Sequence, residues 1–220
     1  MPTLEATQSK IAESVYAGPQ SSAGAIRSPR GYYVQIGKPF FDFGFALLLL
    51  ILLLPLAAAI AIAIKLDSQG TVLFRQERYG KNGKAFRIFK FRTMYSHVPK
   101  EGRSPDRKDD TRVTRVGRVL RRASLDEIPQ LLNILRGEMS FIGPRPEQKS
   151  IVEQYYTPLE KQRFMVTPGI TGLWQTSPDR LAPIHENLHH DYEYIRNLSI
   201  GLDLKIVYRT FKVMIKSNTH

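Results

Sequence analysis

Residues 45–64, FALLLLILLLPLAAAIAIAI, form an unbroken run of twenty residues without a charged side chain. An α-helix rises about 1.5 Å per residue, so this run would be about 30 Å long, the thickness of the hydrocarbon core of a bilayer. The run begins too far from the N-terminus to be the apolar part of a signal peptide. We therefore predict a membrane helix, with the core helix of a soluble protein as the alternative.

Two features bear on how this helix meets the membrane. Pro55 lies near its middle, where proline removes a backbone hydrogen bond and clashes with the preceding turn. Both ends are flanked by basic residues, which favour the cytoplasmic side of membranes. These residues are Arg27, Arg30 and Lys38 before the run, and Lys65, Arg75, Arg78 and Lys81 after it. A re-entrant helix broken at Pro55 would place both ends on one side, and a kinked spanning helix is the alternative.

The charge of the chain is concentrated directly after this run. The 220 residues carry 32 lysines and arginines against 20 aspartates and glutamates, a net charge of +12. Residues 65–122 hold seventeen of the basic and six of the acidic residues, so this segment alone carries +11. Such a segment indicates either nucleic acid or an anionic membrane surface with phosphorylated substrates. The sequence has no zinc finger, RNP motif or P-loop, so we do not predict nucleic-acid binding.

The rest of the sequence indicates one folded domain behind a tail. Residues 1–33 are rich in Ser, Ala, Gly and Pro without periodicity, which predicts a flexible N-terminal tail. Residues 34–66 contain the membrane helix, and residues 67–220 form the domain. The chain has no cysteine, which excludes disulfides and thiolate sites.

Local patterns within the domain predict a mixed α/β fold that is rich in helices and has a small sheet. Residues 71–74 and 85–91 are typical of short strands, and Gly80, Asn82 and Gly83 between them indicate a hairpin turn. Residues 95–111 are polar and predict a loop. Residues 113–122, VTRVGRVLRR, predict a basic amphipathic helix, which is either a solvated surface helix or one that lies on a membrane.

Ser124, Asp126 and Glu127 begin the next predicted helix. Ser124 can cap it, and Glu127 would complete a capping box three residues later. Acidic residues are expected in a first turn because of the helix dipole, so the pair has a purely structural interpretation. The functional interpretation is a carboxylate pair that holds Mg²⁺ and offers one oxygen as a nucleophile to phosphorus. Arg145, between two prolines, is suited to bind phosphate with both arms of its guanidinium.

Many ordered blocks of sequence point together to one family. They are FD at residues 41–42, the proline at 55, FRQERYG at 74–80, KFRTM at 90–94, RVTRVG at 112–117, LR at 120–121, SLDEIPQL at 124–131, the asparagine at 133, GEMS at 137–140, GPRP at 143–146, PGITGLWQ at 168–175, YIRNLS at 194–199 and LDLK at 202–205. In this order the blocks resemble the bacterial sugar transferases known as small monotopic phosphoglycosyl transferases. The resemblance covers roughly residues 38–216.

The resemblance implies a reaction and the residues that perform it. Members of this family move a hexose-1-phosphate from a UDP-sugar to a polyprenyl phosphate such as undecaprenyl phosphate, release UMP and start the assembly of exopolysaccharides or glycoconjugates. By this resemblance Asp126 is the nucleophile and forms a covalent phosphosugar intermediate, while Glu127 helps to hold Mg²⁺. Arg121 and Arg145 correspond to arginines that bind phosphate, and Lys90 falls in a motif that lines the site.

The resemblance also implies a location. It favours the re-entrant form of the helix, bent at Pro55, in a monotopic protein on the cytoplasmic face of the bacterial inner membrane, with anionic lipids as partners. Two departures from the family pattern bear on this. Leu54 replaces the serine usual before the membrane proline, and residues 176–180, TSPDR, form a loop one residue longer than usual. The sequence leaves open which sugar is moved and whether the chain forms a homodimer.

Two other functions compete with transfer. His185, Glu186 and His189 match the H-E-x-x-H pattern of zinc hydrolases, in which two histidines bind zinc and the glutamate acts as a general base. Chance explains so short a motif equally well in a chain with five histidines, and no third ligand stands out at a distinctive spacing. The other competitor is a basic membrane-surface scaffold without catalysis.

Overall fold

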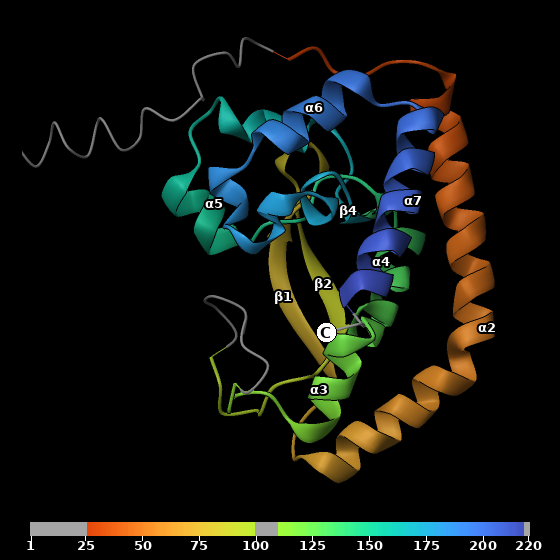
Figure 1. Cartoon of the computed structure of the whole chain (residues 1–220), viewed down its shortest axis with the longest axis vertical. Coiled ribbons are helices and arrows are strands. Elements are labelled where there is room, and N and C mark those ends of the chain that lie inside the picture. Colours follow the sequence, from red (N-terminus) through yellow and green to blue (C-terminus); the bar gives the residue numbers. More distant parts are fainter. Residues whose placement is uncertain (1–25, 100–109, 218–220) are drawn as a thin grey trace, which may run out of the picture.

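The computed structural model describes residues 26–99 and 110–217. Most of the predicted tail and part of the predicted loop 95–111 lie outside these residues. The α-helices are α2 (Lys38–Asp67), α3 (Arg115–Arg122), α4 (Leu131–Leu135), α5 (Lys149–Tyr155), α6 (His189–Asn197) and α7 (Ile200–Ser217). The strands are β1 (Leu73–Tyr79), β2 (Ala85–Phe91), β3 (Ser140–Ile142) and β4 (Gly169–Thr171). Figure 1 shows this arrangement, a helix-rich fold with small sheets, as predicted.

Short helical turns connect these elements. A π-helix, Tyr33–Gly37, leads into α2. The 3-10 helices are Lys81–Gly83, Leu125–Gln130, Glu160–Met165, Trp174–Thr176, Pro178–Leu181 and Ile184–Glu186.

Strands β1 and β2 form the predicted hairpin, paired antiparallel from Leu73 opposite Phe91 to Tyr79 opposite Ala85. The turn needs a left-handed backbone at two positions, with φ of 56° at Asn82 and 69° at Gly83, and these residue types tolerate it best. The predicted first strand, residues 71–74, is too short. The second half of β1 is polar and only half-buried, so it lacks the apolar signal by which a strand is recognised. The second sheet pairs β3 with β4 in parallel.

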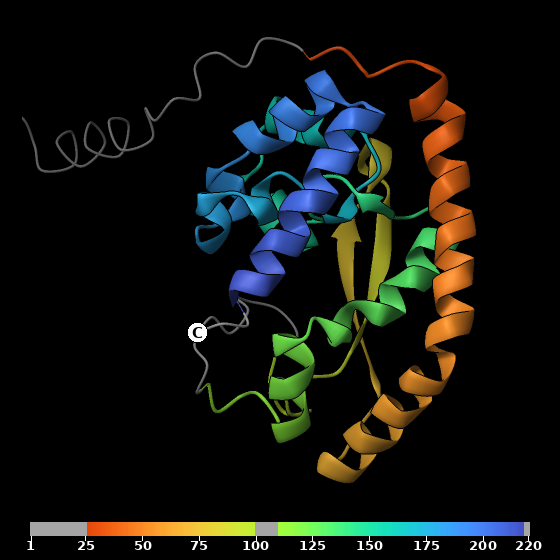
Figure 2. The same cartoon turned by 45° about the vertical axis from the view of Figure 1, so that its right-hand side comes forward.

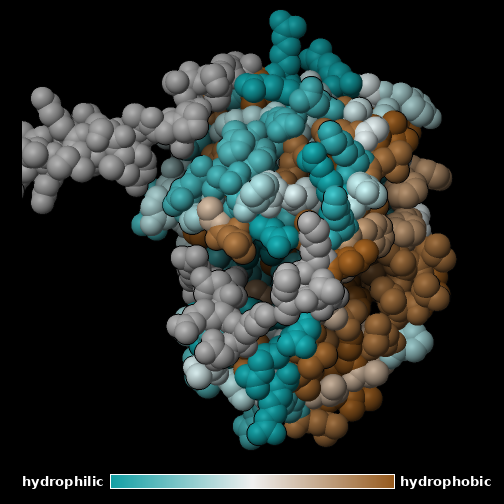
Figure 3. Space-filling view, viewed as in Figure 1, coloured by the Kyte–Doolittle hydropathy of each residue, from teal (hydrophilic) through white to brown (hydrophobic). Residues whose placement is uncertain are grey.

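Helix α2 runs along one side of the domain (Figure 1). It buries a narrow face of Ala46, Ile60 and Ile64 against the domain, while apolar residues on its other faces are exposed. These are Phe45, Leu47, Leu48, Ile51, Leu52, Leu54, Leu56 and Ile62. Figure 3 shows hydrophobic residues gathered along this side of the molecule. Among the described residues, Tyr33–Asp67 is the one helical stretch long and apolar enough to cross a membrane.

The helix is continuous from Lys38 to Asp67 and contains Pro55 in its interior. Figure 2 shows that α2 bends, so that its two limbs run in different directions. A proline inside a helix is an established cause of a sharp bend, because it removes one hydrogen bond of the ladder. The helix is thus bent but not interrupted, while a break at Pro55 and re-entrance stay predictions.

A buried ionic network joins the start of α2 to the end of the chain. Lys38 Nζ donates to Asp203 Oδ2 of α7 at 2.7 Å, with both side chains at most 10% exposed. Tyr33 and Tyr194 donate their hydroxyls to the two oxygens of the same carboxylate, at 2.6 and 2.9 Å. Farther along α2, Asp42 Oδ1 accepts the Phe141 amide at 3.3 Å. The apolar helix is thus fixed to the domain by polar bonds as well as by packing.

Candidate active site

Four of the five predicted site residues line one cavity. It has a volume of about 860 Å³ and is bordered by Asp126, Lys90, Arg121 and Arg145, which come from four separate parts of the chain. The fifth, Glu127, reaches the group through Lys90, whose Nζ lies 2.7 Å from Glu127 Oε1. The fold therefore brings together residues that lie up to 55 positions apart in the sequence.

Asp126 and Glu127 lie in the 3-10 helix Leu125–Gln130, directly after α3. The predicted capping box is wrong. Ser124 has a left-handed backbone, with φ of 55°, and its side chain makes no capping bond. The Glu127 side chain instead pairs with Lys90 on β2. The acidic pair does lie in the first turn of a helix, but no capping box contributes to its explanation.

Glu127 is held as a carboxylate by two cations. Its Oε1 lies 2.7 Å from Lys90 Nζ and 3.6 Å from an Arg145 guanidinium nitrogen. Burial disfavours the charge, but Lys90 and Arg145 outweigh it and lower the pKa of Glu127 to about 2. Glu127 is therefore a fixed negative charge at any physiological pH.

The pKa of Asp126, in contrast to that of Glu127, is raised. Burial is the largest influence and raises the pKa of its carboxyl, Lys90 opposes this, and the charge of Glu127 adds to it. Arg121 and Arg145 also favour the ionised form. Burial thus favours the neutral acid of Asp126, while the surrounding cations favour its carboxylate.

Two close contacts position the arginines. Arg121 Nε donates to Thr93 Oγ1 at 2.9 Å, and α3 packs so tightly that a side chain at Gly117 would collide with the Thr93 backbone. The backbone of Arg145 is fixed by Arg163, which donates to its carbonyl oxygen at 2.7 Å. Arg163 and its partner Asp191 are buried, with side chains 1% and 4% exposed.

The donor set fits a magnesium ion. Mg²⁺ binds proteins through one or two carboxylates and completes its shell with water and substrate phosphates. Asp126 and Glu127 are adjacent carboxylates, and the burial that raises the pKa of Asp126 means that its charge favours a nearby cation. Lys90 engages one oxygen of Glu127, which leaves the other as a candidate ligand.

The sequence analysis missed several polar residues that line the cavity, namely Gln76, Arg78, Tyr95, Arg112 and Gln148. Gln76 and Arg78 lie two apart on β1, so they share one face of the strand, and Gln76 Nε2 donates to Gln148 Oε1 at 2.9 Å. Had the strand been extended through residue 79, this alternation would have indicated both. No local signal in the sequence identifies Gln148.

The H-E-x-x-H pattern does not form a zinc hydrolase site. Its two histidines belong to different helices, since His185 lies in the 3-10 helix Ile184–Glu186 and His189 begins α6. His185 stacks on Tyr155 with ring centroids 5.0 Å apart, while His189 Nε2 lies 3.8 Å from Asp179. The pattern requires both histidines on one face of a continuous helix, and here the helix is interrupted.

The domain thus carries a carboxylate pair beside a lysine and two arginines, and it is fixed to a long apolar helix. Comparison with known proteins identifies the family: residues 33–217 match the bacterial sugar transferases, and the chain belongs to this family.

Relatives give the similarity in detail. The chain is 42% identical over 156 residues to a UDP-N-acetylgalactosamine-undecaprenyl-phosphate N-acetylgalactosaminephosphotransferase of Aeromonas hydrophila, covering 69% of this chain and 37% of the relative. It is 41% identical over 162 residues to a UDP-glucose:undecaprenyl-phosphate glucose-1-phosphate transferase of Caulobacter vibrioides, covering 70% and 60%. It is 40% identical over 157 residues to an exopolysaccharide production protein, PSS, of Rhizobium leguminosarum, covering 66% and 78%. The chain thus spans little more than a third of the Aeromonas relative.

Proposed function

We propose that the chain transfers a hexose-1-phosphate from a UDP-sugar to a polyprenyl phosphate, with undecaprenyl phosphate as the natural acceptor, and releases UMP. The observation that carries the proposal is the position of Asp126, a half-buried carboxylate in a cavity with Lys90, Arg121 and Arg145. The names of the Aeromonas and Caulobacter relatives, which specify UDP-sugars and undecaprenyl phosphate, support the choice of substrates. The name of the Rhizobium relative supports a role in exopolysaccharide production, and we place the chain at its first step.

The proposed reaction has two displacements at one phosphorus atom. An oxygen of Asp126 attacks the phosphorus that bears the sugar, the bond to the oxygen of UMP breaks, and UMP leaves with that bonding pair. An oxygen of the lipid phosphate then attacks the acyl phosphate, and the Asp126 carboxylate leaves. The product is a polyprenyl diphosphate sugar, and the enzyme returns to its starting state.

The cations of the site suit this chemistry because both substrates are anionic. Arg121 and Arg145 would bind the diphosphate and stabilise the charge that develops on its oxygens. Lys90 would contact the same phosphate oxygens while it keeps its ion pair with Glu127. When bound by Asp126 and Glu127, Mg²⁺ would supply further charge neutralisation at the diphosphate.

The apolar helix gives the proposal its location. We infer that α2 enters and leaves a bacterial inner membrane on the cytoplasmic face, bent at Pro55, with basic residues of the domain against anionic lipids. This brings the cavity to the surface where a polyprenyl phosphate presents its headgroup. A homodimer is compatible with this placement.

The decisive experiment weighs the intact protein after incubation with single UDP-sugars and Mg²⁺. The wild type should gain the mass of one sugar phosphate, and adding polyprenyl phosphate should remove it. Asp126→Asn should gain none, while Glu153→Gln, an exposed change outside the cavity, should behave as the wild type. An adduct that persists in Asp126→Asn would overturn the assignment of the nucleophile. A scaffold without catalysis would form no adduct in any variant.

Topology has its own test, since the chain has no cysteine. Single cysteines placed at Ser28 and Asn82, on either side of α2, should both react with an impermeant reagent only from the cytoplasmic side. Labelling of the two positions from opposite sides would show a spanning helix and refute re-entrance.

A further inference from the structure

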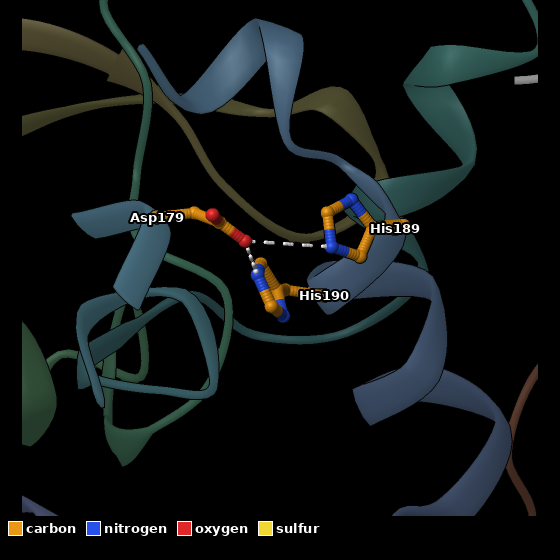
Figure 4. A group of neighbouring side chains, drawn as sticks. All are labelled: Asp179, His189 and His190. Carbon is orange, nitrogen blue, oxygen red and sulfur yellow. Dashed lines mark hydrogen bonds and ion pairs between the residues drawn. The ribbon is translucent and has the colours of Figure 1, made fainter. Parts of the chain in front are cut away.

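The segments around the disrupted H-E-x-x-H pattern bring a different set of ligands together. Asp179, in the 3-10 helix Pro178–Leu181, faces His189 and His190 at the start of α6 (Figure 4). His190 Nε2 lies 2.8 Å and His189 Nε2 lies 3.8 Å from the same oxygen, Asp179 Oδ2. One ligand atom from each of the three residues lies within 4.8 Å of the others. In the described part of the chain this is the one such group of three.

We propose that these three residues bind one divalent cation of the zinc class and thereby join the Pro178–Leu181 segment to α6. This proposal is independent of the proposed transfer reaction and of the magnesium site proposed at Asp126 and Glu127.

The distances suit a tetrahedral ion. Zinc binds histidine nitrogen and carboxylate oxygen at about 2.0–2.2 Å, so neighbouring ligand atoms of a tetrahedron are about 3.3–3.5 Å apart. The two measured nitrogen–oxygen separations, 2.8 and 3.8 Å, lie on either side of this value. A shift of about half an ångström in each ring would therefore suffice.

The chemistry of the donors selects the ion. Two imidazoles and one carboxylate favour zinc and other borderline first-row metals over Mg²⁺ or Ca²⁺, which prefer oxygen alone. The imidazole rings converge, with centroids 4.0 Å apart. Asp179 Oδ2 lies 2.8 Å from His190 Nε2 but 3.8 Å from His189 Nε2, whereas a cation would be bound by both rings.

Both halves of the site are held by contacts with the rest of the domain. Asp179 is fixed through its backbone, because its amide donates to Ser177 Oγ at 3.1 Å and its carbonyl accepts the Ala182 amide at 2.9 Å. The start of α6 is fixed by Asp191, which follows His190 and binds the buried Arg163. Binding would thus need little reorganisation, which favours affinity.

The site also has room for a fourth ligand. The side chains of His189 and Asp179 are 61% and 44% exposed, so water can reach the ligand atoms. Two histidines, one carboxylate and an open position form the donor set that zinc uses in several proteins with three protein ligands. The three ligands come from two segments, so a bound ion would hold Pro178–Leu181 against α6.

The test uses the full chain in detergent or nanodiscs, purified without a histidine tag and kept in excess Mg²⁺ to occupy magnesium sites. Cobalt and zinc serve as probes, with cobalt followed by its visible absorption and bound zinc measured by elemental analysis after dialysis. We expect about one equivalent of bound metal and a higher melting temperature with zinc. His189→Gln and Asp179→Asn should each weaken binding by at least about tenfold, and zinc should no longer raise their melting temperature.

Two controls locate the metal. His185→Gln, in the same region but outside the group, and Glu127→Gln, at the candidate active site, should bind as tightly as the wild type. The proposal is overturned if the wild type binds no cobalt or zinc, because the group is then only a hydrogen-bonded pair with a neighbour. It is equally overturned if His189→Gln and Asp179→Asn bind as the wild type does, or if Glu127→Gln abolishes binding.

Discussion

Replacing Asp191 by asparagine tests the ion pair that holds α6 against the 3-10 helix Glu160–Met165. Arg163 Nε and one terminal nitrogen lie 2.8 and 2.7 Å from Asp191 Oδ2, and both side chains are almost fully buried. Burial opposes the charge of Arg163, but the Asp191 carboxylate outweighs it and raises the pKa of the guanidinium. Asparagine can keep an oxygen in the place of Oδ2, so the substitution removes the negative charge and little else.

The expected cost follows from the burial. Removing one partner of a buried ion pair costs about 3–5 kcal/mol, because the other charge is left uncompensated. The Arg163 side chain cannot readily move into solvent, because it also donates hydrogen bonds to Tyr156 Oη at 3.1 Å and to the Arg145 carbonyl at 2.7 Å. In a protein of this size each kcal/mol lowers the melting temperature by about 2–4 °C, so we expect a drop of about 6–20 °C.

Thermal unfolding can be followed by the fluorescence of Trp174, the single tryptophan, which packs against the same hydrophobic core as α6. Glu77→Gln is the matched control, because its ion pair with Lys149, 3.5 Å long, is exposed, with side chains 48% and 41% exposed. Exposed pairs contribute about 0.2–1 kcal/mol. If Asp191→Asn melts no lower than Glu77→Gln, the argument from burial is wrong.

Three further substitutions test the site and its support. Arg121→Met should move the acidic limb of the pH–rate profile to higher pH. Arg121 favours the ionised form of Asp126, so its loss should raise the pKa of that carboxyl further. An acidic limb that is unchanged or moves to lower pH would contradict this. Gly117→Ala should destabilise the protein by about 1–3 kcal/mol in chemical denaturation, because the added methyl group would collide with neighbouring backbone. Gly201→Ala is the control: its methyl group meets open space in α7, so it should stabilise the protein or change nothing. Asn133→Ala should lower the free energy of unfolding by about 1–3 kcal/mol in the same measurement. This fully buried side chain accepts a hydrogen bond from the Phe89 amide of β2 at 3.0 Å and donates one to the Arg87 carbonyl at 2.8 Å. A cost below about 0.5 kcal/mol would refute that role.

The elements predicted well from the sequence are those with a strong local signal. The membrane helix was predicted from the composition of residues 45–64 alone. The hairpin turn was predicted from the residue types that tolerate its backbone geometry, Asn82 and Gly83. The second half of β1 was missed because its polar residues are stabilised by contacts with distant segments, such as Gln76 with Gln148. The capping box failed for a similar reason, since the Glu127 side chain finds a better partner on β2 than in its own turn.

The candidate site was predicted largely through the family resemblance rather than from local physics. On local grounds Asp126 and Glu127 had a sufficient structural explanation as acidic residues of a first helical turn. What distinguishes the two carboxylates is tertiary, because Lys90 lies 37 positions away and lowers the pKa of Glu127, while burial raises that of Asp126. Opposite shifts in adjacent carboxyls are typical of functional sites, but only the fold makes them visible.

The structure also divides the basic segment 65–122 among different tasks, although the sequence presents it as one charge of +11. Arg92 donates to the carbonyl oxygens of Ser68 and Gln69 at the C-terminal end of α2, where a helix carries partial negative charge. Lys90 and Arg121 line the cavity.

Three exposed arginines of this segment lie on α3, at Arg115, Arg118 and Arg122. Helix α3 contacts α2 beside Asp67, whose carboxylate accepts the Val116 amide at 3.0 Å, so these charges lie next to the end of the apolar helix. Lipid headgroups would meet the protein at this place if α2 enters a membrane. Neutralising the three exposed arginines should therefore weaken binding to anionic vesicles without altering the adduct at Asp126, whereas loss of Lys90 or Arg121 should do the reverse. Equal effects of both sets on vesicle binding would show that the segment acts as one undivided charge.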